Sequence, residues 1–175
     1  RTKSRGLGDV YKRQMLNLIK EVYQNYFEIA SAMFASLVIV LAYILDKVFF
    51  LQACAMCILT RYAFGLIILT SLISYLLKSK FSYLLMVLSS SFGIFITSKQ
   101  IYIQNLTVEE LSSLSGCGMP FHTMVDYFGL IEAITRTLAG GPSCAEDGMR
   151  FILNFAEWGL VFFVFYFVLS LKKVL

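Results

Sequence analysis

Residues 58–97 read ILTRYAFGLIILTSLISYLLKSKFSYLLMVLSSSFGIFIT, two apolar stretches separated only by Lys78-Ser79-Lys80. The two stretches, 58–77 and 81–97, are each close to the roughly 17–25 residues that a helix needs to cross a ~30 Å hydrocarbon core. An open strand would leave backbone groups unpaired in lipid, so helices are the expected spanning form. Because the connection is so short, the sequence predicts a tight antiparallel hairpin of two membrane-spanning helices.

Two further apolar stretches, at about 27–51 and 155–171, bring the expected number of spans to four. Hydrophobic residues make up 58% of the 175-residue chain and charged residues only 15%, whereas a soluble domain is roughly 45–50% apolar. We therefore expect an all-α integral membrane protein, an antiparallel four-helix bundle forming a single domain over residues 15–175. The net charge of +4 forms no basic stripe beside exposed aromatic residues, so nucleic acid is not an expected partner.

Residues 1–14 differ from the rest of the chain. They contain five of its fifteen basic residues and show no apolar period, and Met15 follows them. We interpret this segment as appended or non-native and exclude it from the domain. The alternative is a genuine basic tail in the cytoplasm.

Charge predicts how the four spans are oriented, because short cytoplasmic loops carry an excess of Lys and Arg. Four spans place the basic residues beside the short connections on one side of the membrane: Lys20, Lys78, Lys80, Lys172 and Lys173. The opposite side receives the long loop, about residues 99–154, where acids outnumber bases. Both termini are therefore expected in the cytoplasm, with the long loop on the outer side of the membrane.

The long loop carries apolar residues at helical spacing: Phe121, Met124, Val125, Phe128, Ile131, Ile134 and Leu138. Pro120 lies before this segment, and Gly140-Gly141-Pro142 follows it. We expect a short amphipathic helix that lies along the outer membrane surface. A helix packed on top of the bundle is the alternative.

All four cysteines map to the outer side. Cys54 and Cys57 form a C-x-x-C at the start of the second span, and Cys117 and Cys144 bracket the expected surface helix. Of the three possible pairings, placement favours Cys54–Cys57 and Cys117–Cys144.

Three interpretations of these cysteines compete. Two structural disulfides suit an oxidising compartment, but a C-x-x-C closes so short a loop that it removes little chain entropy. A zinc site would lack the paired C-x-x-C knuckles and the histidine partner of common zinc sites, so no metal is expected. Thiol–disulfide exchange is favoured, because C-x-x-C supplies an attacking and a resolving thiol.

Arg61 strengthens the interpretation as an exchange site. It follows Cys57 by four residues, which places it one turn along the same helix face. A guanidinium that stays charged stabilises a nearby thiolate, and a charge inside an apolar span is usually functional. The alternative is an arginine that extends to the membrane interface.

Two segments resemble the disulfide bond formation protein B (DsbB) family. Cys54-Ala-Met-Cys57-Ile-Leu-Thr-Arg61 resembles the start of its second span. Cys117-Gly-Met-Pro, followed by the expected helix and by Gly-Pro-Ser-Cys144-Ala-Glu146 with Trp158 downstream, resembles its second periplasmic loop. The resemblance covers about residues 25–171, with the same element order and all four cysteines.

The resemblance implies an inner-membrane oxidase that passes electrons from a periplasmic, DsbA-like thioredoxin-fold protein to a quinone, either ubiquinone or menaquinone. Cys117 would form the mixed disulfide with the partner, and Cys144 would be its disulfide mate. Cys54 and Cys57 would reoxidise that pair. Cys57 would lie nearest the quinone, with Arg61 beside it.

Other positions that the resemblance touches are less specific. Gln100 and Gln104 match positions where the family often carries polar groups near the quinone, although ordinary interfacial residues would look the same. The chain departs from the family pattern at Ala53, usually Pro, and at Thr60, commonly Gln or Glu. A DsbB-like oxidase with one dedicated substrate, and a membrane protein with purely structural disulfides, are the alternatives. A vitamin K epoxide reductase-like enzyme fits less well, because its C-x-x-C comes late in the chain.

Overall fold

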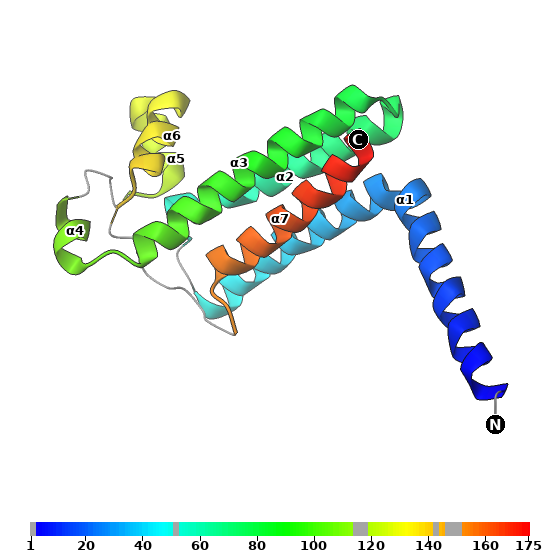
Figure 1. Ribbon diagram of the computed structural model, residues 1–175. Helices are drawn as coiled ribbons and strands as arrows, with labels where there is room; N and C mark the ends of the chain where they lie inside the picture. Colours follow the sequence, from blue (N-terminus) through cyan, green and yellow to red (C-terminus); the bar gives the residue numbers. More distant parts are fainter. Residues whose placement is uncertain (1–2, 51–52, 114–118, 142–143, 146–151) are drawn as a thin grey trace.

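The computed structural model describes residues 3–50, 53–113, 119–141, 144–145 and 152–175, which form seven helices and no strand (Figure 1). Four segments are long and apolar enough to cross a membrane. They are residues Tyr26–Phe49 of α1 (Lys3–Phe49), and the helices α2 (Ala55–Leu77), α3 (Lys80–Gln104) and α7 (Phe155–Val174). The predicted all-α membrane bundle is therefore confirmed.

Three of the four spans, those of α2, α3 and α7, are longer than the apolar runs alone indicate. α3 continues to Gln104, past Lys99 and Gln100, whereas the apolar stretch ends at Thr97. α1 begins at Lys3 as one helix, and Figure 1 shows its first part extending away from the bundle. The proposed non-native origin of residues 1–14 stays a prediction.

The α2–α3 hairpin follows from the residues that join the two helices. Lys78 ends α2 in the left-handed conformation, with φ 45° and ψ 38°, and its N–H donates to the Ser74 carbonyl at 2.9 Å. Ser79 begins the next helix, because its hydroxyl accepts a hydrogen bond from the Ser82 N–H. This pair of caps closes the turn in two residues.

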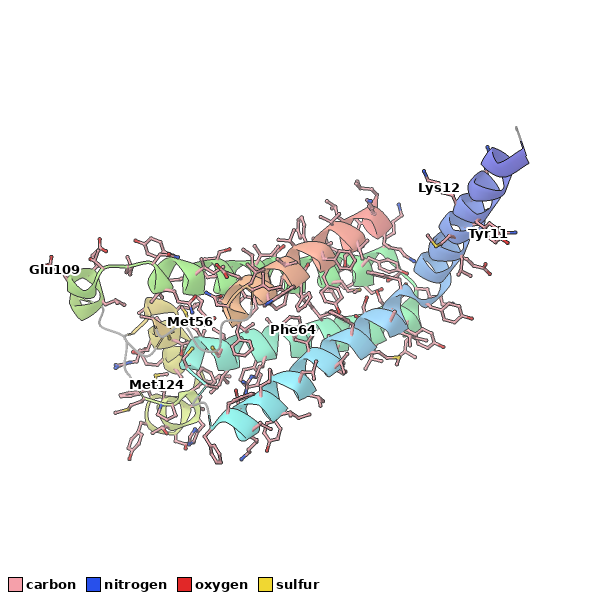
Figure 2. The ribbon with its side chains drawn as sticks, turned by 90° about the horizontal axis from the view of Figure 1, so that it is seen from below. Tyr11, Lys12, Met56, Phe64, Glu109 and Met124 are labelled. Carbon is pink, nitrogen blue, oxygen red and sulfur yellow. The ribbon has the colours of Figure 1, made fainter. Side chains whose placement is uncertain are left out.

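The bundle is ordered α1–α2–α3–α7 by its packing contacts. Phe64 of α2 stacks on Phe163 of α7, with ring centroids 4.3 Å apart, and Figure 2 shows Phe64 inside the bundle. Gly93 of α3 makes room for this pair: a Cβ there would lie 2.3 Å from the Phe163 ring. Small residues at such positions let helices approach closely in a membrane.

A buried polar cluster joins three helices at one end of the bundle. Tyr83 of α3 donates a hydrogen bond to the carboxylate of Glu28 on α1. The ammonium of Lys173 on α7 is 3.7 Å from the same carboxylate. Figure 1 places the α2–α3 turn and the C-terminus at this end, and the short helices at the other end.

The expected loop helix is divided into α5 (Phe121–Phe128) and α6 (Leu130–Ala139). The break is at Gly129, whose φ of 80° favours glycine and ends the first helix. A further short helix, α4 (Val108–Ser113), precedes them. The expectation of one continuous helix was wrong, because the spacing of the apolar residues does not show whether a glycine between them interrupts the helix.

The α5–α6 pair rests on the start of α2. Phe121, Met124 and Ala133 are buried in one cluster with Ala55. The opposite side exposes other apolar residues, above all Ile131, which is 83% exposed. The pair therefore packs on the bundle end and also presents an apolar surface outward.

Candidate functional site

The first two cysteines lie at the N-terminus of α2. Cys54 is the N-cap, and its sulfur accepts a hydrogen bond from the Cys57 N–H at 3.2 Å. The two sulfurs are 3.0 Å apart as thiols, so a bond of about 2.05 Å needs only a small movement. The unpaired N–H groups at a helix start favour negative charge, which suits a thiolate.

Cys144 meets this pair from the long loop. It is 3% exposed and forms a buried cluster with Met56 and Ile103, against which Cys54 packs. Figure 2 shows Met56 at the end of the bundle beside α5 and α6. Cys117 lies outside the described residues, so the expected Cys117–Cys144 disulfide stays a prediction. The structure thus brings together three thiols, two from the start of α2 and one from the long loop.

The thiols are not equivalent. Hydrogen bonding with the Cys144 thiol, then with the Cys57 thiol, and burial together raise the pKa of Cys54 well above its usual range. Each of these contacts is better made by the protonated sulfur. This pKa shift therefore favours the protonated form of Cys54 in the reduced site.

Gln100 of α3 is the polar residue that reaches the sulfurs. Its side chain is 3% exposed, and its Nε2 donates to the Cys57 sulfur at 3.2 Å, with the Cys54 sulfur at 3.8 Å. An amide N–H can only donate a hydrogen bond and cannot accept one from a thiol. Its hydrogen bond to the Cys57 sulfur therefore favours the thiolate. The extension of α3 beyond its apolar run is what brings Gln100 to this place.

Gln104, one turn further along α3, has a different environment. Its Oε1 accepts a hydrogen bond from Asn154 Nδ2 at 3.0 Å. Asn154 also caps α7, through a reciprocal pair of hydrogen bonds with Glu157. The structure therefore brings Gln100 but not Gln104 to the cysteines. The sequence N-F-A-E before an apolar run is a signal for this cap that our sequence analysis did not use.

Arg61 lies one turn beyond Cys57 on α2, as its spacing predicts. Its Nη2 is 2.6 Å from Oδ2 of Asp46 on α1. Asp46 lies within the first apolar stretch of the sequence, and a carboxylate inside a span is itself a functional signal. Among the described residues, no group of three or more His, Cys, Asp or Glu is placed to hold a metal ion.

The family model for disulfide bond formation protein DsbB matches residues 24–172. The chain belongs to the DsbB family. It is similar to disulfide bond formation protein B of a Polaromonas species, with 32% identity over 125 residues, covering 69% of this chain and 72% of that protein. The same protein of Albidiferax ferrireducens is 30% identical over 135 residues, 74% of this chain and 75% of the relative.

A third relative, disulfide bond formation protein B of Marinobacter nauticus, is 27% identical over 140 residues, 77% of this chain and 82% of that protein. No solved structure matches the chain. Membership in the DsbB family and four apolar helices make the chain a multi-pass membrane protein of disulfide bond formation. The resemblance stated from the cysteine motifs is thereby confirmed.

Proposed function

We propose that the chain is an inner-membrane oxidase that reoxidises a periplasmic, DsbA-like thioredoxin-fold protein and passes the electrons to a quinone. The observation that carries this proposal is the meeting of Cys54, Cys57 and Cys144 at the N-terminal end of α2. A loop staple has no need of a third thiol in contact with a C-x-x-C. An exchange relay needs such a contact, because a thiolate must reach a disulfide sulfur.

The first exchange starts at the loop pair. A thiolate of the reduced partner attacks the Cys117 sulfur of a Cys117–Cys144 disulfide, and Cys144 leaves as a thiolate. The partner's second thiolate then displaces Cys117, so the partner leaves oxidised and the loop pair is left reduced. Two electrons have then entered the chain.

The second exchange passes those electrons to the C-x-x-C. The Cys144 thiolate attacks the Cys54 sulfur, against which it packs, and Cys57 leaves as a thiolate. Cys117 then displaces Cys54 from Cys144, which restores the loop disulfide. Cys54 takes up a proton as its raised pKa requires, and Gln100 donates its hydrogen bond to the Cys57 thiolate.

The surroundings of Cys57 fit a quinone. The guanidinium of Arg61 and the amide of Gln100 are hydrogen-bond donors, as the two carbonyl oxygens of a quinone require. Tyr62, the residue after Arg61, is 58% exposed on a helix whose outer surface faces lipid, from which a quinone can approach. A quinone bound there supplies an acceptor for two electrons and two protons. Both termini would then lie in the cytoplasm, and the cysteines in the periplasm.

A Cys57→Ser variant tests the order of transfer. Without Cys57, the lone Cys54 thiol should attack Cys144, the neighbouring sulfur of the loop disulfide, and release Cys117. Non-reducing proteolysis and mass spectrometry should then recover a peptide pair linked by Cys54 and Cys144. A purely structural pair predicts that Cys117–Cys144 stays intact and Cys54 stays free. That result, or a Cys54–Cys117 link instead, would contradict the proposed order.

A further inference from the structure

A carboxylate stands inside the first span, where burial of a charge is costly. Asp46 is near the C-terminal end of the span Tyr26–Phe49, and its side chain is only 22% exposed. Charged residues at such depth are paired or functional. The partner of Asp46 is Arg61, at 2.6 Å, whose side chain is 26% exposed.

Lys47, the cation next to Asp46, lies over an aromatic ring. Lys47, next to Asp46 in the chain, has its ammonium 5.7 Å from the centre of the Tyr43 ring. The short distance between Asp46 and Arg61 is that of a charge-assisted hydrogen bond. It joins α1 to α2 one turn beyond Cys57.

An arginine side chain at a helix end is long enough to extend to the membrane surface. A carboxylate on the neighbouring helix prevents this, because the ion pair and its hydrogen bond fix the guanidinium. The same carboxylate also offsets part of the positive charge that reaches Cys57. Asp46 therefore affects both where the Arg61 guanidinium lies and how strongly its positive charge acts on the Cys57 sulfur, although Asp46 does not touch that sulfur.

We infer that Asp46 is a positioning residue for Arg61: its carboxylate holds the guanidinium one turn from Cys57 and limits how strongly the cation stabilises the Cys57 thiolate. This inference rests on the proposed function, in which Cys57 delivers electrons to a quinone beside Arg61. It assigns to α1 a part in a site otherwise built from α2, α3 and the long loop.

The decisive readout needs no quinone. In the reduced full-length protein, the rate of Cys57 alkylation at pH 10 reports access of the reagent, and the ratio of the rates at pH 7 and pH 10 reports the thiolate fraction at pH 7. Asp46→Asn keeps an oxygen that accepts from the guanidinium, so the cation stays in place and this ratio should rise about threefold, as expected for removal of one charge at roughly 10 Å in a medium of intermediate dielectric. Arg61→Ala should lower it by a similar factor. An equal rise at both pH values in Asp46→Asn would mean a loosened bundle and would overturn the inference.

Two further variants separate positioning from a mere link between helices. Asp46→Glu should restore the wild-type ratio. Asp46→Arg combined with Arg61→Asp restores an ion pair between α1 and α2 but puts a carboxylate near Cys57, so the ratio should fall below that of the wild type. If the exchanged pair restored the wild-type ratio, Asp46 would be only a helix link, and the inference would fail.

Glu28→Gln is the matched control. It removes an acid from the same helix, about 27 Å away along its axis, and breaks the contact with Lys173. The alkylation ratio at Cys57 should not change in this variant, and a change as large as that in Asp46→Asn would count against the inference.

Turnover gives an independent check. Asp46→Leu, which has no acceptor for the guanidinium, should raise the quinone KM at least threefold while kcat stays within twofold, since the donor is no longer held in place. An unchanged KM in this variant would contradict positioning of Arg61. If the wild-type protein reduces no quinone, the proposed function fails, whereas the alkylation ratios still decide the role of Asp46.

Discussion

Replacing Gln100 with Leu should make Cys57 less reactive. The amide Nε2 lies 3.2 Å from the Cys57 sulfur, and Leu fills a similar volume without a donor. A hydrogen bond to a charged group contributes about 1.5–3 kcal/mol. Cys57 is only half-buried, and sulfur is a weak hydrogen-bond acceptor. We therefore take the lower end of this range of free energies. About 1.4 kcal/mol corresponds to a factor of ten, and the thiolate fraction of Cys57 should fall about tenfold.

The assay is alkylation of the reduced protein at pH 7 without quinone, followed at the Cys57 peptide by mass spectrometry. Gln104→Leu is the matched control, because Gln104 is one turn away on the same helix and bonds Asn154 instead of sulfur. Its Cys57 rate should match the wild type. A Gln100→Leu rate within twofold of the wild type would refute the reasoning, as would an equal loss in both variants.

Three further outcomes are expected. Gly93→Ala should destabilise the bundle by about 1–3 kcal/mol through overpacking against the Phe163 ring. Gly65→Ala is the control and should not destabilise it, because no atom lies within 4 Å of a Cβ added there. Equal melting temperatures of the two variants would contradict this prediction. Neighbouring thiols and burial raise the pKa of Cys54, so its alkylation in the reduced protein should keep accelerating above about pH 9, and a plateau below that pH would be inconsistent. In a variant without the native cysteines, Ser79→Cys should react with an impermeant maleimide only after the cells are opened, and labelling of intact cells would reverse the orientation.

The sequence was sufficient to predict the architecture, because lipid imposes strong demands on spans. Apolar length gave the four spans, and Lys78-Ser79-Lys80 gave the hairpin. Both predictions follow from two physical requirements that appear directly in the order of apolar and polar residues along the chain. These are the thickness of the hydrocarbon core and the need to pair every backbone group inside it.

What the sequence could not supply depends on three-dimensional placement. The break at Gly129 was missed because one glycine in an apolar period does not show whether its φ is positive. The contact of Gln100 with sulfur requires α3 to continue past Lys99, which hydropathy does not reveal. The contact of Cys144 with Cys54 joins residues from separate loops, for which the spacing of cysteines along the chain carries no signal.

The ion pair of Asp46 with Arg61 is an intermediate case. The charge in the first apolar stretch was visible, but its partner depends on how α1 and α2 are rotated against each other. Two charges near the same end of adjacent antiparallel spans could have been matched as a candidate pair.

Electron transfer from a protein dithiol to a quinone is tested most directly by measuring both ends of the relay together. The purified full-length chain in detergent, without oxygen, is given a reduced C-x-x-C protein of thioredoxin fold and a soluble ubiquinone or menaquinone analogue. Quinone reduction is followed by ultraviolet absorbance, and the remaining partner thiols are counted. We predict one quinone reduced for each disulfide formed, and loss of both signals in Cys57→Ser and in Cys144→Ala. Quinone reduction that survives the loss of Cys144, or partner oxidation without any quinone reduction, would contradict the relay.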